Sequence, residues 1–433
     1  MIGADTRASS SQPAAPASLA AAGLTLDLVT QLVLKTLYLA GELTGVELSR
    51  RLGVLFGVLE PSLEFLKSQR HCEVVGGAML GGASFRYRIS DAGRSSAALY
   101  LQQNAYIGTA PVPLEQYQRY MRAFGQMGQQ MVTREQVRKA YAHMVLSDAV
   151  LDEIGPAINA RHSLFVYGPP GNGKTSIAHA IRSLVSGEIA IPYALEVEGH
   201  IIRIFDPVTH ERIADEQDDR GLELDTSDDR RWTRCRRPMV TVGGELSLES
   251  LDLNFEPRLG FYRAPVQLLA NGGVLLIDDF GRQHCSPREL LNRWLVPLES
   301  RVDYLTLQSG WKFEAPFLVF VVFATNIKPA DLVDEAFLRR VQYKVFAESP
   351  SEEAFIRIFE TCCVERAIPF DRGLVSWLLE HVYRPRQLQT RACQPRDLIN
   401  QALLLAGYLG RERLLTPELL EAACASYFVE DRE

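Results

Sequence analysis

The sequence predicts an α/β fold around a parallel sheet, preceded by a small domain of helices and a hairpin and followed by a helical bundle. Three observations predict this order. Between His162 and Ser349, short apolar runs alternate with helical stretches, as is typical of a parallel sheet with helices on both faces. Before that region, three helical stretches precede two strand-like runs. After Ser349, only helical periodicity remains.

Length, charge and cysteine content exclude several classes of protein. The 433 residues carry 46 Lys and Arg against 53 Asp and Glu, a net charge of −7, and suggest about three domains. The longest apolar run, Phe317 to Ala324, is far shorter than the ~20 residues of a membrane span, so we expect no membrane association. The seven cysteines are scattered without a CxxC pair, which argues against a disulfide framework or zinc site and favours a reducing, cytoplasmic location.

The first hundred residues predict a tail and a winged-helix domain. Residues 1–23 are mostly Ala, Ser and Pro, and we expect a disordered tail there. Thr44, with Glu47 three residues later, has the pattern of a capping box at a helix start. Three helices followed by a hairpin and a further helix is the order of a winged helix-turn-helix, expected over 24–106. The predicted helices are Leu24–Ala40, Thr44–Leu52, Val58–Arg70 and Asp91–Tyr106, and the predicted strands are Cys72–Val75 and Ser84–Ile89.

Residues 107–145 predict a linker with helices. The linker opens with the prolines at 111 and 113, and two helices are expected, Leu114–Gln129 and Thr133–Ile158. Further along, the stretch Asp215–Arg237 is first acidic and then rich in arginine, and it has few apolar residues. We interpret it as a solvated insertion, with an interaction loop as the alternative.

A glycine-rich loop between a strand and a helix is the strongest motif in the chain. The apolar run Leu164–Tyr167 precedes a complete GxxxxGK[ST] pattern, and a helical run follows it. Glycines allow backbone N–H groups to turn toward phosphate oxygens, and the helix N-terminus adds its dipole. Lys174 supplies a charge for the β- and γ-phosphates, and the Thr175 hydroxyl can ligate Mg²⁺. The predicted nucleotide-binding residues are Gly168, Pro169, Pro170, Gly171, Asn172, Gly173, Lys174, Thr175 and Ser176.

Polar side chains also follow two other predicted strands. Asp278 and Asp279 end the apolar run that begins at Gly273, and Asn326 follows the run Leu318–Ala324. Ligands bind at the carboxyl ends of strands in an open parallel sheet. We therefore expect Asp278 to hold Mg²⁺, Asp279 to orient the attacking water, and Asn326 to position that water or sense the γ-phosphate. The alternatives are a helix N-cap pair and an ordinary turn residue.

In this order the motifs resemble those of AAA+ ATPases, over about Leu146 to Phe428. The resemblance implies ATP and Mg²⁺ as cofactors, with the glycine-rich loop as Walker A, Leu275–Asp279 as Walker B and Asn326 as sensor 1. Arg396, which follows a proline at a helix start, looks like sensor 2 in a helical lid. Walker B normally ends Asp-Glu in this family, whereas the second acid here is Asp279. Turnover is therefore expected to be slow, and a nucleotide switch with negligible turnover is an alternative.

The resemblance also implies an assembly. Arg340 resembles the arginine finger that reaches the nucleotide of a neighbouring subunit, and Arg339 is the second candidate for that role. Hydrolysis would then require a homo-oligomeric ring, commonly a hexamer. The expected domains are a tail over 1–23, a winged helix over 24–106, a linker with helices over 107–145, an AAA+ domain over 146–348 and a helical lid over 349–433.

Two finer features resemble the branch of AAA+ proteins that includes the MoxR-like ATPases. Arg301–Pro316 looks like a hairpin before the sensor strand, and Glu245–Leu269 looks like a loop inserted into the second helix. Both elements usually touch the substrate, so Phe261, Tyr262, Arg263 and Trp311 are candidate pore contacts. The alternative is that these residues are simply packed aromatics.

The winged helix leaves two functions open. Residues 24–100 hold eight Lys and Arg against seven Asp and Glu, whereas a DNA-reading domain is usually clearly basic. The favoured function is therefore a ring ATPase that remodels a protein client, as a MoxR-like chaperone would. The alternative is a DNA-associated motor or loader whose winged helix grips duplex DNA.

Overall fold

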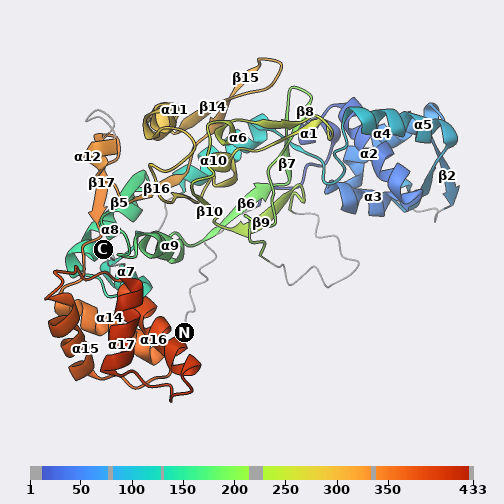
Figure 1. Ribbon diagram of the computed structural model, residues 1–433. Coiled ribbons are helices and arrows are strands. Elements are labelled where there is room, and N and C mark those ends of the chain that lie inside the picture. The colour runs from blue at the N-terminus through green and yellow to red at the C-terminus, as the bar shows by residue number, and fades with distance from the viewer. Residues whose placement is uncertain (1–11, 77–80, 128–130, 214–227, 333–337, 429–433) are drawn as a thin grey trace, which may run out of the picture.

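The computed structural model describes residues 12–76, 81–127, 131–213, 228–332 and 338–428. Figure 1 shows an elongated arrangement, with the N-terminal helices at one end, an α/β body in the middle and a helical bundle at the other end. The predicted fold class is confirmed, because a five-stranded parallel sheet is flanked by helices and followed by a helical region. Among the described helices, none combines the length and apolar character needed to cross a membrane.

The central sheet has the strand order β10-β13-β16-β5-β17, and all of its pairings are parallel. The three strands expected from the motifs are neighbours, with β16 between β5 and β13. Their side chains are almost all buried because helices cover both faces, which explains their continuous apolar runs. The strands are β5 (Ser163–Tyr167), β10 (Met239–Val242), β13 (Val274–Ile277), β16 (Phe320–Thr325) and β17 (Tyr343–Phe346).

Alternate residues of these strands enter two different cores. Leu164 and Leu276 pack with helices α7, α8 and α9 on one face. Phe165 and Leu275 pack with Trp294 of α11 on the other face. The covering helices are α7 (Arg134–Ala140), α8 (Asp148–Ala160), α9 (Lys174–Leu184), α10 (Val266–Leu269), α11 (Pro287–Ser300) and the short α12 (Pro329–Leu332).

The prediction of one helix over Thr133–Ile158 is wrong, because α7 and α8 are separate. The buried Tyr141 hydroxyl donates a hydrogen bond to the carbonyl oxygen of Ile177 (2.9 Å), which anchors the chain after α7. The Ser147 side chain then caps the start of α8 by accepting from the N–H of Val150. The preceding helix, α6 (Leu114–Gln126), begins at the predicted residue, whereas its prediction extended to Gln129.

The interpretation of Asp215–Arg237 as a solvated insertion is wrong for its described part. Trp232–Arg236 forms strand β9, which pairs antiparallel with β6, and Trp232 and Cys235 lie in a core. Its arginines alternate with these core residues, and Arg234 pairs with Glu188. The acidic residues 215–227 lie outside the described residues. β6 (Glu188–Pro192) and β9 form a two-stranded sheet, with β7 (Ala194–Val197) and β8 (His200–Arg203) between them in the chain. A further sheet has the order β11-β12-β8-β7-β4 and contains, besides β7 and β8, the strands β4 (Val112–Pro113), β11 (Asn254–Glu256) and β12 (Phe261–Arg263).

The predicted hairpin before β16 is present, but two of the three proposed aromatic contacts are buried. β14 (Val302–Thr306) pairs with β15 (Lys312–Pro316), and Gly310 takes a φ of +85° in the turn. Trp311 is about half exposed at this turn. Phe261 and Tyr262 are packed instead, and the Tyr262 hydroxyl accepts a hydrogen bond from the N–H of Gln308. For these two residues the structure favours the alternative of packed aromatics.

The predicted helices and strands of the N-terminal part are present in order, with one strand that was not predicted, β1, between the first two predicted helices. β1, β3 and β2 form a sheet in that order against the helices. Thr44 and Glu47 form the predicted capping box at the start of α3. The elements are α2 (Leu26–Ala40), β1 (Glu42–Thr44), α3 (Gly45–Leu52), α4 (Phe56–Ser68), β2 (Cys72–Gly76), β3 (Arg86–Ile89) and α5 (Asp91–Gln103).

The prediction of a disordered tail through residue 23 is wrong for residues 12–23, and residues 1–11 lie outside the described residues. Leu19–Ala22 forms helix α1, which Ser18 caps. The Gln12 side chain donates to the carbonyl oxygens of Asp229 and Trp232 (2.8 and 2.9 Å). Main-chain hydrogen bonds hold this Ala- and Pro-rich segment, and such bonds need no apolar side chains.

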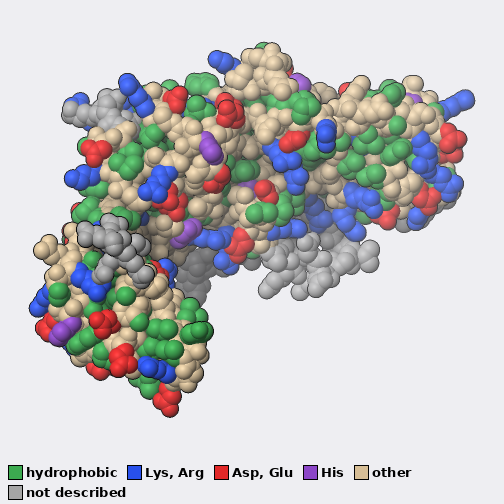
Figure 2. All heavy atoms as spheres, viewed as in Figure 1, with side chains coloured by type: hydrophobic (Ala, Val, Ile, Leu, Met, Phe, Trp, Pro, Cys, Tyr) green, Lys and Arg blue, Asp and Glu red, His purple; other side chains and the backbone are tan. Residues whose placement is uncertain are grey.

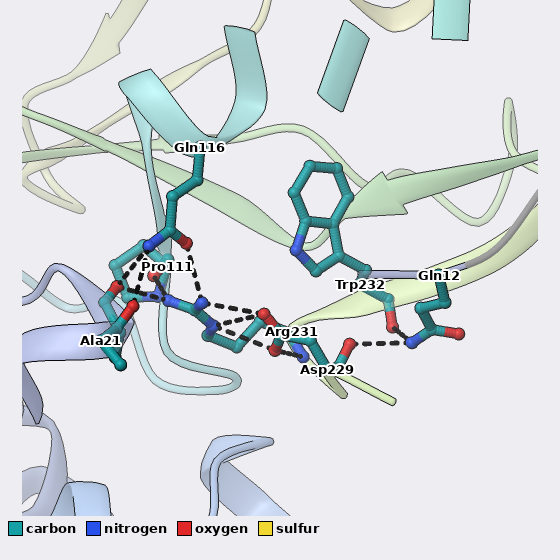
Figure 3. A network of polar contacts seen from close by, with 8 residues as sticks. Gln12, Ala21, Pro111, Gln116, Asp229, Arg231 and Trp232 are labelled. Atoms are coloured by element: carbon teal, nitrogen blue, oxygen red, sulfur yellow. Dashed lines mark hydrogen bonds and ion pairs between the residues drawn. The ribbon is translucent and has the colours of Figure 1, made fainter. Parts of the chain in front are cut away.

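A buried ion pair joins the N-terminal segment to the α/β body. The side chains of Arg231 and Asp229 are only 1% and 2% exposed. The Nη2 atom of Arg231 lies 2.8 Å from Oδ2 of Asp229. The Arg231 guanidinium also donates to the carbonyl oxygens of Ala22 (3.0 Å) and Pro111 (3.4 Å) and to the side chain of Gln116 (2.9 Å). Figure 3 shows these groups converging on one guanidinium from four parts of the chain.

The C-terminal helices form a separate bundle with its own core. Phe355, Phe359, Leu398 and Leu420 lie at the centre of this core, which is fully buried. The helices are α14 (Glu352–Glu365), α15 (Arg372–Leu378), the short π-helix η3 (Leu379–Tyr383), α16 (Gln394–Tyr408) and α17 (Pro417–Tyr427).

Candidate nucleotide-binding site

The loop between β5 and α9 requires its glycines. Gly168, Gly171 and Gly173 have φ values of +147°, +80° and +74°, a region that favours glycine. A Cβ on Gly168 would lie 2.5 Å from the carbonyl oxygen of Ala347, and one on Gly171 would lie 2.6 Å from the sulfur of Cys393. Helix α9 begins directly after this loop, so its free N–H groups and dipole favour an anion there.

Lys174 folds back over the loop that precedes it. Its ammonium donates a hydrogen bond to the carbonyl oxygen of Pro169 (2.9 Å), and the residue is 7% exposed. Burial lowers the pKa of Lys174, and the nearby carboxylates of Asp279 and Asp278 oppose that shift. The cation is therefore held at the loop, with two acids close by.

Thr175 and Asp278 meet although they are far apart in the sequence. The Thr175 hydroxyl, in the first turn of α9, lies 2.9 and 3.1 Å from the two carboxylate oxygens of Asp278, at the end of β13. A hydroxyl and a carboxylate are hard oxygen ligands, which suit Mg²⁺. Among the residues that the structure describes, no cluster of three or more His, Cys, Asp or Glu side chains forms a metal site.

Asp279 and Asn326 also lie together, because β13 and β16 are neighbours. The Asn326 amide donates to a carboxylate oxygen of Asp279 (3.3 Å). Asp279 has a φ of +48°, a left-handed conformation that costs a non-glycine residue ~1–2 kcal/mol. Asp and Asn are the side chains that best tolerate this conformation. The backbone at this position therefore gives a physical reason for Asp in place of the Glu that the resemblance implied.

Asn172 is turned away from the loop interior, which the sequence did not predict. Its amide nitrogen lies 3.3 Å from both the carbonyl oxygen of Ala347 and the hydroxyl of Ser349, and its oxygen accepts from the N–H of Ala392. The N–H of Cys393 donates to the carbonyl oxygen of Gly171 (2.8 Å). The loop is thus bonded directly to the connection before the C-terminal bundle and to the segment before α16. No sequence pattern marks these contacts.

A cavity of about 570 Å³ lies beside the loop and the C-terminal bundle. The Gly171–Gly173 segment forms one wall, and Arg396, at the start of α16, lies on another. Arg396 is exposed and pairs with Asp397 (3.0 Å). Ser176 also lines the cavity, so the structure brings Arg396 to the same cavity as part of the predicted loop. The remaining walls come from residues 143–147, the connection 347–351 and helix α14.

Arg339 and Arg340 are not among the residues that line this cavity. Arg340 forms an ion pair with Glu299, at the end of α11 (3.1 Å), and Arg339 is exposed. Lys174, Thr175, Asp278, Asp279 and Asn326 do not line it either, so the predicted site residues that share this cavity are Gly171–Gly173, Ser176 and Arg396.

Comparisons with known proteins identify one family model and several structures. Residues 351–426, within the C-terminal bundle, match a domain of unknown function, DUF8689. No curated protein matches the chain. The structure resembles NtrX from Brucella abortus at 14% identity and a TM-score of 0.39, over 66% of this chain and 57% of that one. It also resembles the RuvB Holliday junction branch migration motor from Thermotoga maritima at 12% identity and a TM-score of 0.38, over 66% of this chain and 71% of that one.

Proposed function

We propose that the chain is an AAA+ ATPase that binds ATP and Mg²⁺ at the β5–α9 loop and hydrolyses the nucleotide. One observation carries the proposal: the glycine-rich loop, the Thr175–Asp278 pair and the Asp279–Asn326 pair converge at the carboxyl edge of three adjacent strands. Phosphoryl transfer is catalysed mainly by positioning and by neutralising charge. This edge holds the groups for both tasks.

Each residue then has a defined role. The loop N–H groups and the α9 N-terminus bind phosphate oxygens, and Lys174 leaves the Pro169 carbonyl to pair with the β- and γ-phosphates. Thr175 and Asp278 hold the ion, which when bound neutralises charge on the phosphates. Asp279 orients the attacking water and Asn326 positions the Asp279 carboxylate. Arg396, on the cavity wall, is proposed to contact the nucleotide from the lid.

We further propose that hydrolysis requires a homo-oligomeric ring, most simply a hexamer. Arg340, or Arg339 in its place, would act on the nucleotide of a neighbouring subunit; within this chain Arg340 pairs with Glu299, and Arg339 is exposed. The proposed domains are a winged helix over 24–106, a linker with helices over 107–145, an AAA+ domain over 146–348 and a lid over 349–433. All seven cysteines lack disulfide bonds, which supports a cytoplasmic location.

The favoured substrate is a protein client, as for a MoxR-like chaperone. In a winged helix, α4 would be the recognition helix, and its outer side presents Glu60, Glu64 and the 43% exposed Phe65. Arg86 and Arg88 of the hairpin both pair with Glu42 (3.3 and 2.8 Å). Acids and an exposed aromatic suit contact with protein, and paired arginines are poorly placed to neutralise phosphates.

A DNA-associated motor or loader is the second candidate, and one observation favours it. Arg50 and Arg51 are exposed in the last turn of α3. The main chain of exposed Arg230 lies beside Gly53, two residues after Arg51, because its carbonyl oxygen would be 2.8 Å from a Cβ on Gly53. Figure 2 shows Lys and Arg side chains along this lower edge of the N-terminal part.

The rate of ATP hydrolysis against protein concentration tests both candidates. A ring with shared sites should show a specific activity that rises with concentration, because each site needs a neighbour. We expect no change on adding duplex DNA at a fixed salt concentration. Stimulation by DNA that weakens with salt would support the motor instead. No turnover under any condition would leave a nucleotide switch.

Arg340→Ala is expected to lower ATP hydrolysis by at least ~10³-fold, the contribution of an arginine finger, while ATP binding is retained. The Arg340–Glu299 pair is partly exposed, so its loss should cost less than ~1 kcal/mol of stability. Mixing this variant with Lys174→Ala should restore some activity. The Lys174 variant supplies an intact Arg340, and the Arg340 variant supplies an intact nucleotide site. Arg339→Ala is the matched control, and loss of activity in that variant alone would transfer the role to Arg339.

A further inference from the structure

The Gln283 side chain makes three hydrogen bonds to the main chain of the turn that follows β13. Its amide nitrogen donates to the carbonyl oxygens of Asp278 (3.0 Å) and Asp279 (3.2 Å). Its amide oxygen accepts from the N–H of Gly281 (2.7 Å). Gln283 is half-buried and is not among the residues that line the cavity. All three of its hydrogen bonds go to the main chain around Asp279.

The sheet holds the same turn from the other side. The N–H of Phe280 donates to the carbonyl oxygen of Ala324 (2.8 Å), and the buried Thr325 hydroxyl donates to the carbonyl oxygen of Phe280 (2.7 Å). Asn326, the next residue, holds the Asp279 carboxylate. The turn is thus fixed between β16 and Gln283.

Fixing this turn matters because two of its residues have positive φ. Asp279 has a φ of +48° and Gly281 a φ of +106°. Such a conformation in a non-glycine residue persists only where its surroundings enforce it. A primary amide can donate to two carbonyl groups and accept from an N–H at once, which a carboxylate cannot do.

We propose that Gln283 is a positioning residue that keeps Asp279 in the left-handed conformation in which its carboxylate faces Asn326 and the attacking water. This inference rests on the proposed ATPase function. Loss of the Gln283 contacts removes this partner from the carbonyl oxygen of Asp278 and the N–H of Gly281, and leaves the carbonyl oxygen of Asp279 with the N–H of Arg282 alone (3.0 Å). The Asp279 backbone can then relax. The carboxylate leaves its place while the phosphate-binding loop is unchanged.

The test compares steady-state ATP hydrolysis and nucleotide affinity in three variants. Gln283→Ala should lower kcat by about 10- to 100-fold, because a shift of ~1 Å in a catalytic group can cost about 10²-fold, with KM for ATP unchanged. Gln283→Glu keeps the size and the acceptor but loses the donor, so it should be equally impaired. His284→Ala, an exposed neighbour, should match the original protein.

A double substitution separates positioning from general stability. In an Asp279→Asn background, Gln283→Ala should lower kcat no further, because the carboxylate that it positions is already gone. A full additional loss there, or a KM that rises as kcat falls, would overturn the proposal. So would normal kcat in both Gln283 variants of an active enzyme. Absence of hydrolysis by the original protein would instead refute the proposed function.

Discussion

Lys174→Ala is expected to abolish ATP binding and hydrolysis. Lys174 is the only lysine of the β5–α9 loop, and its ammonium lies at the loop with Asp279 and Asp278 close by. Its removal leaves those carboxylates facing the phosphates without the compensating charge of the Lys174 ammonium. Charge-assisted hydrogen bonds contribute about 1.5–3 kcal/mol each, and two of them correspond to an affinity loss of about 10²- to 10⁴-fold.

Binding of a fluorescent ATP analogue and steady-state phosphate release measure this effect. Lys139→Ala, which removes an exposed lysine from the last turn of α7, is the matched control and should bind and hydrolyse normally. Thermal unfolding without nucleotide should differ little between the two variants. Turnover by Lys174→Ala at the rate of the control would contradict the assignment of the loop as the nucleotide site.

The parts of the site that depend on strand order could be predicted from the sequence. Lys174, Asp278 and Asn326 each follow an apolar run that is buried on both faces of the sheet. Parallel strands bring their carboxyl ends to one edge, so residues about 150 positions apart become neighbours without any further signal. Periodicity and glycine spacing carry this information directly.

Contacts between a side chain and a distant main chain could not be predicted. Asn172 bonds to the connection before α14, and Gln283 bonds to the turn after β13. Both are ordinary polar residues in the sequence, and their partners are carbonyl and N–H groups that every residue possesses. The left-handed backbone of Asp279 is hidden for the same reason, because only the fold imposes it.

The same limit explains the errors over residues 12–23 and 228–237. Hydrophobic patterning identifies segments by their apolar side chains, whereas the N-terminal segment is held through carbonyl groups such as that of Ala22. Arg231 appeared to belong to a solvated basic run, yet it is among the largest fully buried side chains of the described residues. Its partner Asp229 lies two residues away, and that short spacing is the one local signal of a buried pair.

Arg231→Ala is expected to destabilise the junction between the N-terminal part and the α/β body by ~3–5 kcal/mol. The substitution leaves the Asp229 carboxylate buried without its counter-ion. It also removes the donors that serve the carbonyl oxygens of Ala22 and Pro111 and the side chain of Gln116. Figure 3 shows that no other cation among the residues drawn could replace the guanidinium. Limited proteolysis should then cut within residues 12–22, which these contacts hold.

Arg230→Ala is the matched control, because it removes an exposed arginine from the adjacent position. Its unfolding free energy in urea should lie within ~0.5 kcal/mol of that of the original protein. Combining Arg231→Met with Asp229→Leu should recover part of the loss, since the cost comes from an unpaired buried charge and not from the absence of an ion pair. Equal stability of the Arg230 and Arg231 single variants would show that the buried pair does not hold the junction. If the double variant were less stable than Arg231→Ala, the polar network itself, and not charge compensation, would be what joins the two parts.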